Sequence, residues 1–573
     1  MVIQNNIKTI LIYYFPFIAA FFLGSFLRLY GIEKQIPLDD EWHGLFAAAV
    51  NSYAYLASHL FYSGISIPYT LYQKLALSTV GWDEITVRLP SIAAGILSLL
   101  ICPFYVNRMF GKRIAVIFSF LLALSPLLVF YSRCARSYSV IMLLSFVALL
   151  SFYYWITTEN RQERNIFITS SVLSVYFHLF AIVPFFSMFL YVFFLPTKEY
   201  RLRVSSKYLF FTGCLCLVAM AALYMPALIN SSQSFLSQRV NIDHPNIKSF
   251  LGFVDLLLGV SNKGSIIGIL VFLFFGQVIM FKKHKLAAGL FSIISVGLII
   301  AIVITSPPSM QVSLQIARYG ILIFPLSFIL IALGLDSLIN ILQDKCFSKN
   351  YVCVRLMEGM IITAFGFCIF WVGPLPNIYF ATKNFTNHSA YQESYVPLNK
   401  GEPYVSQPAA QYRFKKGNMS QFYQILSNEK ADLPILEYPM PVGDYFNFYY
   451  FYQRLHGKDV LVGYHPSLTL STPRATDIIA YGNFPIDFIL NNIKDESKLK
   501  FKTIINMLNI AEIKTKNIRY IILHKDLFQE GFNLENLKFE SIAKLASVYQ
   551  NTFGKPIFED QWIVVFGTKE RAL

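Results

Sequence analysis

Long apolar segments separated by short polar connections fill the first two thirds of the chain. A membrane-spanning helix needs about 20 predominantly apolar residues, and the pattern predicts roughly eleven such helices. They are expected at about 9–29, 88–106, 114–131, 138–156, 166–178, 181–195, 208–229, 264–281, 286–305, 319–340 and 357–373. His178 and Pro184 interrupt the pair at 166–195, so a tight turn at one membrane surface is expected there. The fold predicted for this part is a polytopic α-helical membrane protein.

Composition and charge agree with a membrane protein. Of the 573 residues, 55% are hydrophobic and only 14% are charged, which is rare in a soluble chain of this length. The formal net charge of +15 comes largely from Lys and Arg in alternate connections, such as 108–113, 198–207 and 282–285. The positive-inside rule places these connections in the cytoplasm, together with the N-terminus, whose first span is too long for a cleaved signal peptide. This sidedness predicts a plasma-membrane protein, and no basic, aromatic nucleic-acid face is found.

Two polar regions fall on the opposite side of the membrane in this topology. The first outer loop, 31–87, contains amphipathic runs at 42–62 and 68–77 that are typical of interfacial helices. The second region follows a membrane domain of 1–373 and is predicted to form an extracytoplasmic domain of 374–573. Its strand-like runs are 435–438, 459–462, 520–523 and 562–566, and its helical patterns lie near 443–455, 485–492, 498–511 and 538–548. That alternation predicts a small α/β domain without a phosphate-binding glycine loop or a nucleophile elbow.

Three consecutive carboxylates, Asp39, Asp40 and Glu41, follow the first predicted span, and His43 comes two residues later. They lie at the expected depth of the outer headgroups, where a carboxylate can act as general base toward an acceptor hydroxyl. Asp40, with Glu41 beside it, is the candidate catalytic base of a sugar transferase. Asp40 and His43 are also candidate ligands of a divalent cation. The alternatives are that Asp39 or Asp40 caps the helix starting near Trp42 and that His43 is polar surface.

Arginines gather on the same predicted membrane face. Arg88 begins the second span, Arg133 and Arg136 share a short outer loop, and Arg318 precedes a later span. Arginines in short outer connections run against the positive-inside rule, which favours a phosphate ligand. Arg88, Arg136 and Arg318, with Lys74 as a weaker candidate, therefore form a predicted site for the phosphate of the molecule that donates the sugar. Alternatively, Arg88 extends to the lipid headgroups and Lys74 is a headgroup anchor.

The order of these elements resembles the GT-C superfamily, in particular bacterial relatives of the protein O-mannosyltransferases and the lipid A aminoarabinose transferases (glycosyltransferase family 39). The matching pieces are Asp40-Glu41, Ile67-Pro68-Tyr69-Thr70-Leu71-Tyr72, Gly81 through Arg88-Leu89-Pro90-Ser91, Tyr131 through Tyr138, and Arg318-Tyr319 with Pro325. The resemblance covers about the first 340 residues. It implies a polyprenyl-phosphate sugar donor, inversion at the anomeric carbon and Asp40 as the base. It also adds Tyr138 and Tyr319 to the donor-phosphate candidates.

Two positions depart from the pattern of that family. Many relatives carry a Glu where this chain has Cys134, so a second acid in that loop is not expected. A His often precedes the first-loop proline, and Ile67 stands there in this chain. Because the metal requirement varies across the superfamily, the resemblance leaves a divalent cation open as a cofactor.

The preferred interpretation is a plasma-membrane inverting glycosyltransferase. It would move a sugar from polyprenyl phosphate to a hydroxyl on a cell-surface glycan, lipid A or a protein, with membrane lipid around it. A lipid-linked glycan transporter or flippase is the alternative and predicts charged residues at mid-depth in several spans, where the sequence has few. A third interpretation, a membrane-anchored binding protein, leaves the elaborate first outer loop without a purpose.

Overall fold

The computed structural model describes residues 2–32, 39–60, 66–81, 83–195, 202–237, 244–260, 263–306, 310, 312–346, 351–376, 420–429, 435–438, 518–525 and 542–568. Contacts divide the chain into two compact units, one of Met1–Ile32 with Ser52–Ser394 and one of Glu33–Asn51 with Tyr395–Leu573. They are named here the helical unit and the second unit, and each is described by itself. The domain boundary predicted near 373 stays a prediction.

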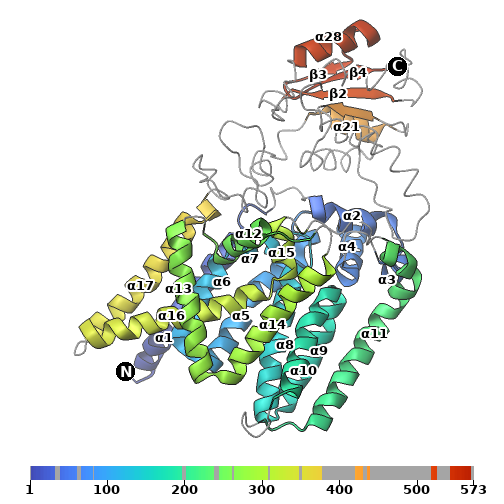
Figure 1. Ribbon diagram of the computed structural model, residues 1–573. Coiled ribbons are helices and arrows are strands. Elements are labelled where there is room, and N and C mark those ends of the chain that lie inside the picture. The colour runs from blue at the N-terminus through green and yellow to red at the C-terminus, as the bar shows by residue number, and fades with distance from the viewer. Residues whose placement is uncertain are drawn as a thin grey trace. The chain divides into compact units, whose positions relative to one another are not determined.

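The helical unit contains a helix in every segment predicted to be apolar and spanning. The long helices are α1 Val2–Leu29, α5 Leu89–Phe110, α8 Tyr138–Thr158, α9 Arg161–Phe177, α11 Ser206–Ser237, α13 Lys263–Lys283, α14 Lys285–Thr305, α16 Ile323–Cys346 and α17 Tyr351–Val372. The shorter ones are α6 Lys112–Leu124, α7 Pro126–Ser132, and α10 Ile182–Phe193 with the 3₁₀ turn η3 Leu179–Ala181 before it. Neighbours such as α8 and α9, or α10 and α14, pack side by side in one bundle (Figure 1).

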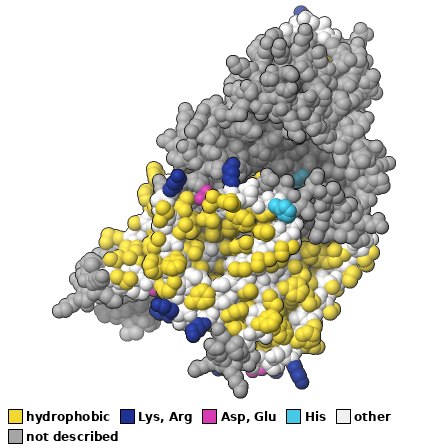
Figure 2. All heavy atoms as spheres, viewed as in Figure 1, with side chains coloured by type: hydrophobic (Ala, Val, Ile, Leu, Met, Phe, Trp, Pro, Cys, Tyr) yellow, Lys and Arg dark blue, Asp and Glu magenta, His cyan; other side chains and the backbone are white. Residues whose placement is uncertain are grey.

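The bundle has the length and apolar surface of a membrane protein. Six described helices are long and apolar enough to cross a membrane, or seven if α6 and α7 form one bent span. α9 is not among them, and Tyr14–Leu29, Leu179–Phe193 and Gly359–Val372 are shorter apolar helices. A hydrophobic band covers the face in Figure 2, with Lys and Arg at its rims. Only 17% of the apolar window of α13 is buried, against 72% for α8, so α13 has the surface of a lipid-facing helix. The predicted multi-pass helical fold is confirmed.

The chain bends by 60° where α6 ends and Pro126 opens α7. Proline has no N–H, so carbonyls at the end of α6 lose their helical partners. The fully buried Arg28 of α1 supplies donors: one terminal nitrogen lies 3.2 Å from the Leu122 oxygen and the other 3.4 Å from the Ala123 oxygen. Its Nε donates to Ser132 Oγ at 3.2 Å. A side chain from α1 thereby holds the bend from inside the bundle.

Short elements gather at one end of the bundle, named here the α4 end (Figure 1). They are α3 Tyr53–Ser58, α4 Ile67–Thr79, the 3₁₀ turn η2 Thr86–Arg88, α12 Ile247–Leu258 and α15 Ser313–Tyr319. The helix predicted at 68–77 is confirmed as α4. The single run predicted at 42–62 is wrong, because the chain forms two separate helices in this region. They are α2 Asp39–Val50 in the second unit and α3 in the helical unit. Ser52 separates them and caps α3 by accepting the Tyr55 N–H at 3.2 Å.

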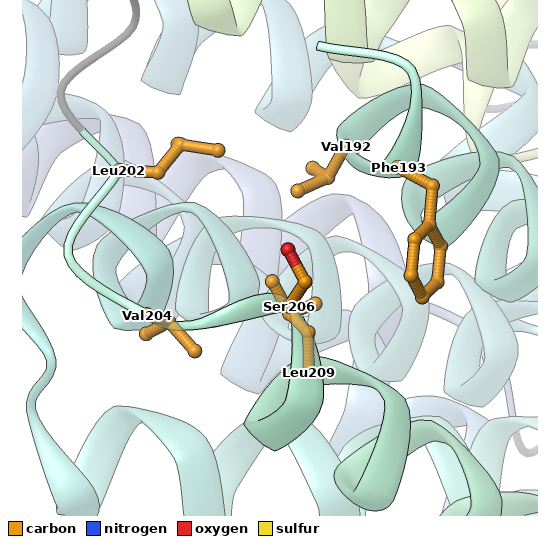
Figure 3. A pocket seen from close by; sticks show the side chains of 6 residues that line it. All are labelled: Val192, Phe193, Leu202, Val204, Ser206 and Leu209. Atoms are coloured by element: carbon orange, nitrogen blue, oxygen red, sulfur yellow. The ribbon is translucent and has the colours of Figure 1, made fainter. Parts of the chain in front are cut away.

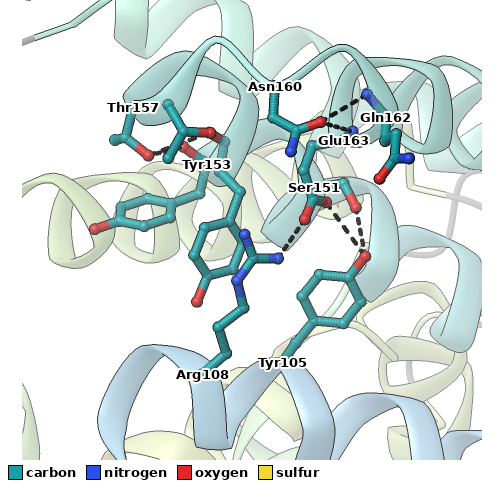
Figure 4. Close-up of polar contacts among 10 residues, drawn as sticks. Tyr105, Arg108, Ser151, Tyr153, Thr157, Asn160, Gln162 and Glu163 are labelled. Atoms are coloured by element: carbon teal, nitrogen blue, oxygen red, sulfur yellow. Dashed lines mark hydrogen bonds and ion pairs between the residues drawn. The ribbon is translucent and has the colours of Figure 1, made fainter.

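Polar side chains join the helices at the opposite end of the bundle (Figure 4). Glu163, in the first turn of α9, pairs with Arg108 in the last turn of α5 and accepts from Tyr105 Oη at 3.4 Å. The Arg108 guanidinium lies 3.7 Å from the centre of the Tyr154 ring, and Tyr105 Oη lies 2.9 Å from Ser151 Oγ. This ion pair and the rings of Tyr105 and Tyr154 beside it hold α5, α8 and α9 together.

A pocket between the end of α10 and the start of α11 shows no comparable chemistry. It is lined by Val192, Phe193, Leu202, Val204, Ser206 and Leu209 (Figure 3). One hydroxyl among five apolar side chains offers neither a base nor a charge. The pocket therefore has the character of a packing gap between two helix ends.

The second unit contains a four-stranded sheet in the order β1-β2-β4-β3. The strands are β1 Ile435–Tyr438, β2 Tyr520–His524, β3 Phe558–Glu559 and β4 Ile563–Gly567. β1 runs parallel to β2, with Ile435 opposite Tyr520, and β4 runs antiparallel to β2, with Gly567 opposite Tyr520. The helices α21 Phe422–Asn428 and α28 Ile542–Phe553 accompany the sheet, and Tyr423 of α21 donates to Glu437 of β1 at 2.9 Å. An α/β unit was predicted and is confirmed.

Three of the four predicted strands correspond to β1, β2 and β4, and the helical pattern near 538–548 corresponds to α28. β3 was not predicted, because two residues are too short to show an alternating pattern. The run at 459–462 and the helical patterns near 443–455, 485–492 and 498–511 lie outside the described residues.

α13 and α16 approach so closely that each has a glycine at the contact. A Cβ added to Gly276 of α13 would overlap the Leu330 carbonyl, and one added to Gly334 of α16 would overlap the Phe272 carbonyl. Lipid tails are as apolar as leucine, so membrane helices associate through close packing of this kind rather than through exclusion of water. The two glycines therefore set the distance between α13 and α16.

Gly276→Val should destabilise the bundle, because the branched side chain meets backbone that cannot rotate away. Overpacking of this kind costs about 1–3 kcal/mol, and the thermal unfolding midpoint in detergent should fall by several degrees. Gly268→Val is the matched control on the same helix, since nothing lies within 4 Å of its added Cβ. Equal melting of the two variants would contradict the close contact between α13 and α16.

Candidate functional site

Four predicted binding residues meet at the α4 end around the start of α8. The guanidinium carbons of Arg136 and Arg318 each lie 5.8 Å from the centre of the Tyr138 ring. The ring of His178 lies 5.9 Å from that of Tyr138 and 5.5 Å from that of Tyr319, between ring centres. Two arginines that are far apart in the sequence thus lie near one aromatic ring, in agreement with the prediction that they share one membrane face.

The connection that carries Arg136 is fixed by bonds to two neighbouring elements. Ser91 of α5 donates to the Arg136 carbonyl, and Gln73 of α4 donates to the Ala135 carbonyl at 3.2 Å. Tyr69 of α4 lies 2.9 Å from Ser91, between their hydroxyl oxygens, and so joins the two supports. Because two buried side chains bond to this short backbone segment and Tyr69 supports one of them, the Arg136 side chain extends from a defined position.

Arg133, in the same connection, has a different role. Its Nη1 donates to the carbonyls of Leu27, Arg28 and Tyr30 at 3.2, 3.4 and 2.8 Å. These carbonyls lie at the end of α1, where no further turn of helix pairs with them. Arg133 therefore caps α1, and the phosphate role of Arg136 stays a prediction.

Arg88 is fully buried, at 0% exposure, where α5 begins. The turn that carries it is bound to α4, since Tyr72 Oη donates to the Thr86 carbonyl at 2.8 Å, and Tyr69 Oη lies 3.4 Å from the Val87 carbonyl oxygen. Burial raises the pKa of Tyr72, which keeps its hydroxyl protonated as a donor. A side chain without exposed surface does not extend to lipid headgroups, so that alternative is wrong for Arg88.

Lys74 lies against α3. Its ammonium nitrogen is 5.5 Å from the centre of the Tyr53 ring, a cation–π distance that joins α3 to α4. Its assignment to the donor phosphate stays a prediction.

His178 is a site residue to which sequence reasoning gave no role. It follows the last turn of α9 and lies outside the membrane-spanning helices. Its Nδ1 accepts the Phe180 N–H at 3.2 Å, so the proton of the neutral ring is on Nε2. Removal from water, with the charges of Arg136 and Arg318 nearby, lowers the pKa of His178 to about 3. The imidazole is therefore a neutral donor beside two guanidiniums, and its only sequence signal was the interruption of an apolar run.

The predicted catalytic acids belong to α2 in the second unit. The side chains of Asp39 and Asp40 lie outside the described residues, so the assignment of Asp40 as base stays a prediction. Glu41 is buried, at 1% exposure, and His43 is partly buried. Across the described part of the chain, no three His, Cys, Asp or Glu side chains group as a metal site would require. The prediction that Asp40 and His43 bind a divalent cation stays a prediction.

Comparisons with known proteins bear on the family and on the fold. A family model described as dolichyl-phosphate-mannose-protein mannosyltransferase matches residues 67–224. No curated protein is significantly similar to the chain. Among solved structures the chain resembles ArnT from Cupriavidus metallidurans, in the apo state at 12% identity and bound to undecaprenyl phosphate at 10% identity. Each match has a TM-score of 0.52 and covers 96% of this chain and 97% of that chain.

A weaker similarity links the chain to the oligosaccharyltransferase AglB from Archaeoglobus fulgidus, with 12% identity over 90% of this chain and 69% of that chain. Its TM-score of 0.46 is too low to carry an assignment. The region matched by the family model runs from α4 into α11 and includes the connection that carries Arg136. The similarity to ArnT extends over almost the whole of both chains and confirms the predicted fold. The family model thus makes residues 67–224 similar to the protein mannosyltransferases, and the chain shares its fold with ArnT.

Proposed function

We propose that the chain is an inverting glycosyltransferase that moves a sugar from a polyprenyl-phosphate donor to an acceptor hydroxyl. The observation that carries the proposal is the pair of guanidiniums, Arg136 and Arg318, at one aromatic ring at the end of a multi-pass bundle. Two guanidiniums near the same ring make this region cationic, which favours an anion, and guanidiniums form strong paired hydrogen bonds with phosphate. A phosphate carried on a membrane lipid is an anion that reaches this depth.

The similar proteins support a lipid-linked phosphate. The description of the family model names dolichyl-phosphate-mannose, and one of the ArnT structures is bound to undecaprenyl phosphate. Both ligands are phosphates on long isoprenoid chains, which suit a protein with this much lipid-facing surface. The donor phosphate would lie between Arg136 and Arg318 and accept a hydrogen bond from His178 Nε2. The remaining members of the proposed phosphate site are Arg88, Lys74, Tyr138 and Tyr319.

The proposed reaction is a direct displacement. The acceptor oxygen attacks the anomeric carbon from the face opposite the phosphate, while Asp40 takes the hydroxyl proton and Glu41 stands beside it in sequence. The bond between the anomeric carbon and the phosphate oxygen breaks, and its electron pair leaves with the polyprenyl phosphate. Arg136 and Arg318 stabilise the charge that develops on this leaving group. Attack from the opposite face inverts the configuration, and a divalent cation, where one takes part, would bind Asp40 and His43.

The described ion pairs favour an enzyme over a lipid-linked glycan transporter. A transporter is expected to place charges at mid-depth in several spans. Arg108 and Glu163 instead pair at the ends of α5 and α9, and Arg113 binds Asp336 from the first turn of α6. The first pair holds two helix ends together, and the second joins the first turn of α6 to Asp336 within α16.

We propose the plasma membrane as the location, with the α4 end outside and the N-terminus in the cytoplasm. Lys282 and Lys283 end α13 and Lys285 begins α14, at the end opposite α4, and Arg108 and Arg113 lie at that end as well. The positive-inside rule places such an end in the cytoplasm. The acceptor would then be a cell-surface glycan, lipid A or a protein.

Asp40→Asn should lower the turnover number by about 10²–10⁴-fold, the usual contribution of a general base. Asp39→Asn is the matched control, because it makes the same substitution one residue away in the first turn of α2, and it should retain most of the activity. Transfer is followed by mass spectrometry of glycolipids and glycoproteins, with a lipid extract of the native host's membranes as donor. A folded Asp40→Asn protein with full activity would rule out Asp40 as the base.

Arg136→Met and Arg318→Met should each weaken the binding of undecaprenyl phosphate by about tenfold or more, because each removes a charge-assisted hydrogen bond. Arg133→Met should instead lower the thermal unfolding midpoint, because the carbonyls at the end of α1 lose their donor. Thermophoresis in detergent measures the affinity and thermal unfolding the stability. If Arg133→Met lost affinity while Arg136→Met kept it, the division of roles between these arginines would be wrong.

A further inference from the structure

One face of α4 buries polar groups that the proposed phosphate site does not use. Thr70 and Gln73 lie about 60° apart around a helix that turns about 100° per residue, and Ser66 is the residue directly before its first turn. Their exposed fractions are 8%, 1% and 1%. Over the described residues, Ser66 Oγ, Thr70 Oγ1 and Gln73 Oε1 have no hydrogen-bond partner. These three side chains are named here the α4 stripe.

The same helix shows how its other hydroxyls are satisfied. Ser78 Oγ and Thr79 Oγ1 donate to the Leu75 carbonyl at 3.0 and 2.8 Å, as helical serine and threonine commonly do. Thr70 Oγ1 makes no bond of this kind, and Ser66, although it precedes the first turn of α4, makes no capping bond with its hydroxyl. The hydroxyls of the α4 stripe are therefore left for a partner outside the helix.

Gln73 links the α4 stripe to the proposed phosphate site. Its Nε2 donates to the Ala135 carbonyl at 3.2 Å. A carbonyl can pair only with the NH₂ of the amide, so this bond fixes the amide orientation and leaves Oε1 as an acceptor. Ala135 directly precedes Arg136, so the neutral stripe adjoins the connection that carries the cationic group.

We propose that Ser66, Thr70 and Gln73 bind hydroxyl groups of the donor sugar while Arg136 and Arg318 hold its phosphate. This inference rests on the proposed function. Two hydroxyls and an amide oxygen offer donors and acceptors without charge, which suits a neutral polyol better than an anion or a cation. Buried polar groups without partners destabilise the ligand-free protein, and sugar hydroxyls that pair with them remove that cost and add specificity.

The experiment uses the full-length protein in detergent. It is incubated with a lipid extract of the native host's membranes to which bare undecaprenyl phosphate is added, and the retained lipids are identified by mass spectrometry. The wild type should enrich a sugar-bearing polyprenyl phosphate over the bare lipid. Thr70→Val and Ser66→Ala should each lower this enrichment about fivefold or more while still retaining the bare lipid.

Two exposed residues of α4 give matched controls. Thr79→Val and Ser78→Ala make the same substitutions where the hydroxyl is satisfied by the helix, and both should keep the wild-type enrichment. Thr70→Ser keeps the hydroxyl and should also keep it. Thr70→Val should raise the melting temperature of the ligand-free protein, because a methyl replaces an unpaired buried hydroxyl of similar size.

The outcomes separate this inference from the proposed function. Unchanged enrichment in both Thr70→Val and Ser66→Ala overturns the sugar subsite and leaves ordered water as the occupant of the α4 stripe, with the proposed function intact. A wild type that enriches no sugar-bearing lipid overturns the proposed function and this inference with it. Loss of the bare lipid together with the sugar-bearing one overturns the inference alone, because the stripe would then act through the phosphate site.

Discussion

Backbone carbonyls that lose their helical partners are the constraint on which the α4 end depends. Inside a bilayer no water replaces a missing partner, so the protein itself must supply a donor. The break at Pro126 and the end of α1 both expose such carbonyls, and the buried arginines Arg28 and Arg133 donate to them. Arg28 reaches from the last turn of α1 to α6, while Arg133 reaches from the end of α7 back to α1. These reciprocal bonds fix α1, α6 and α7 relative to one another.

Once Arg133 caps α1, the short connection after α7 sends Arg136 in a different direction. Ser91 and Gln73 hold the backbone around Arg136, and its guanidinium reaches the first ring of α8. Arg318 arrives at the same ring from α15. The structure thus separates an arginine that satisfies backbone from two that share an aromatic platform, although the sequence presents all three in the same way.

Much of the fold could be predicted because lipid imposes a local requirement, an unbroken apolar run of sufficient length. Every such run became a helix, and an α/β second unit was visible in the alternation of strand and helix patterns. The short helices α12 and α15 were missed because 12 and 7 residues are too few to give the long apolar run of a span. The break after α2 was also missed, although Ser52 is a common type of helix cap.

The sequence predicted the membrane face on which the candidate site residues lie. It did not predict which groups each of them contacts. The roles of Arg28 and Arg133 depend on carbonyls about a hundred positions away, which no local pattern encodes. His178 is a further case, because its neutral state reflects Arg136 and Arg318 from two distant segments. A residue type at the correct depth indicates what chemistry is available, while the contact that decides its use is made by the fold.

The composition of α4 argues that more than a phosphate is recognised at this end. A segment that served only for packing would have apolar residues at 70 and 73 of the helix and at 66 before it, because apolar side chains there would carry no desolvation penalty. The chain instead keeps two hydroxyls and an amide on that buried face, while Tyr69 and Gln73 bind the helix to its neighbours. A neutral hydrogen-bonding surface that adjoins a cationic group matches a molecule with a polyhydroxylated part joined to a phosphate, and a bare lipid phosphate would leave that surface without a purpose.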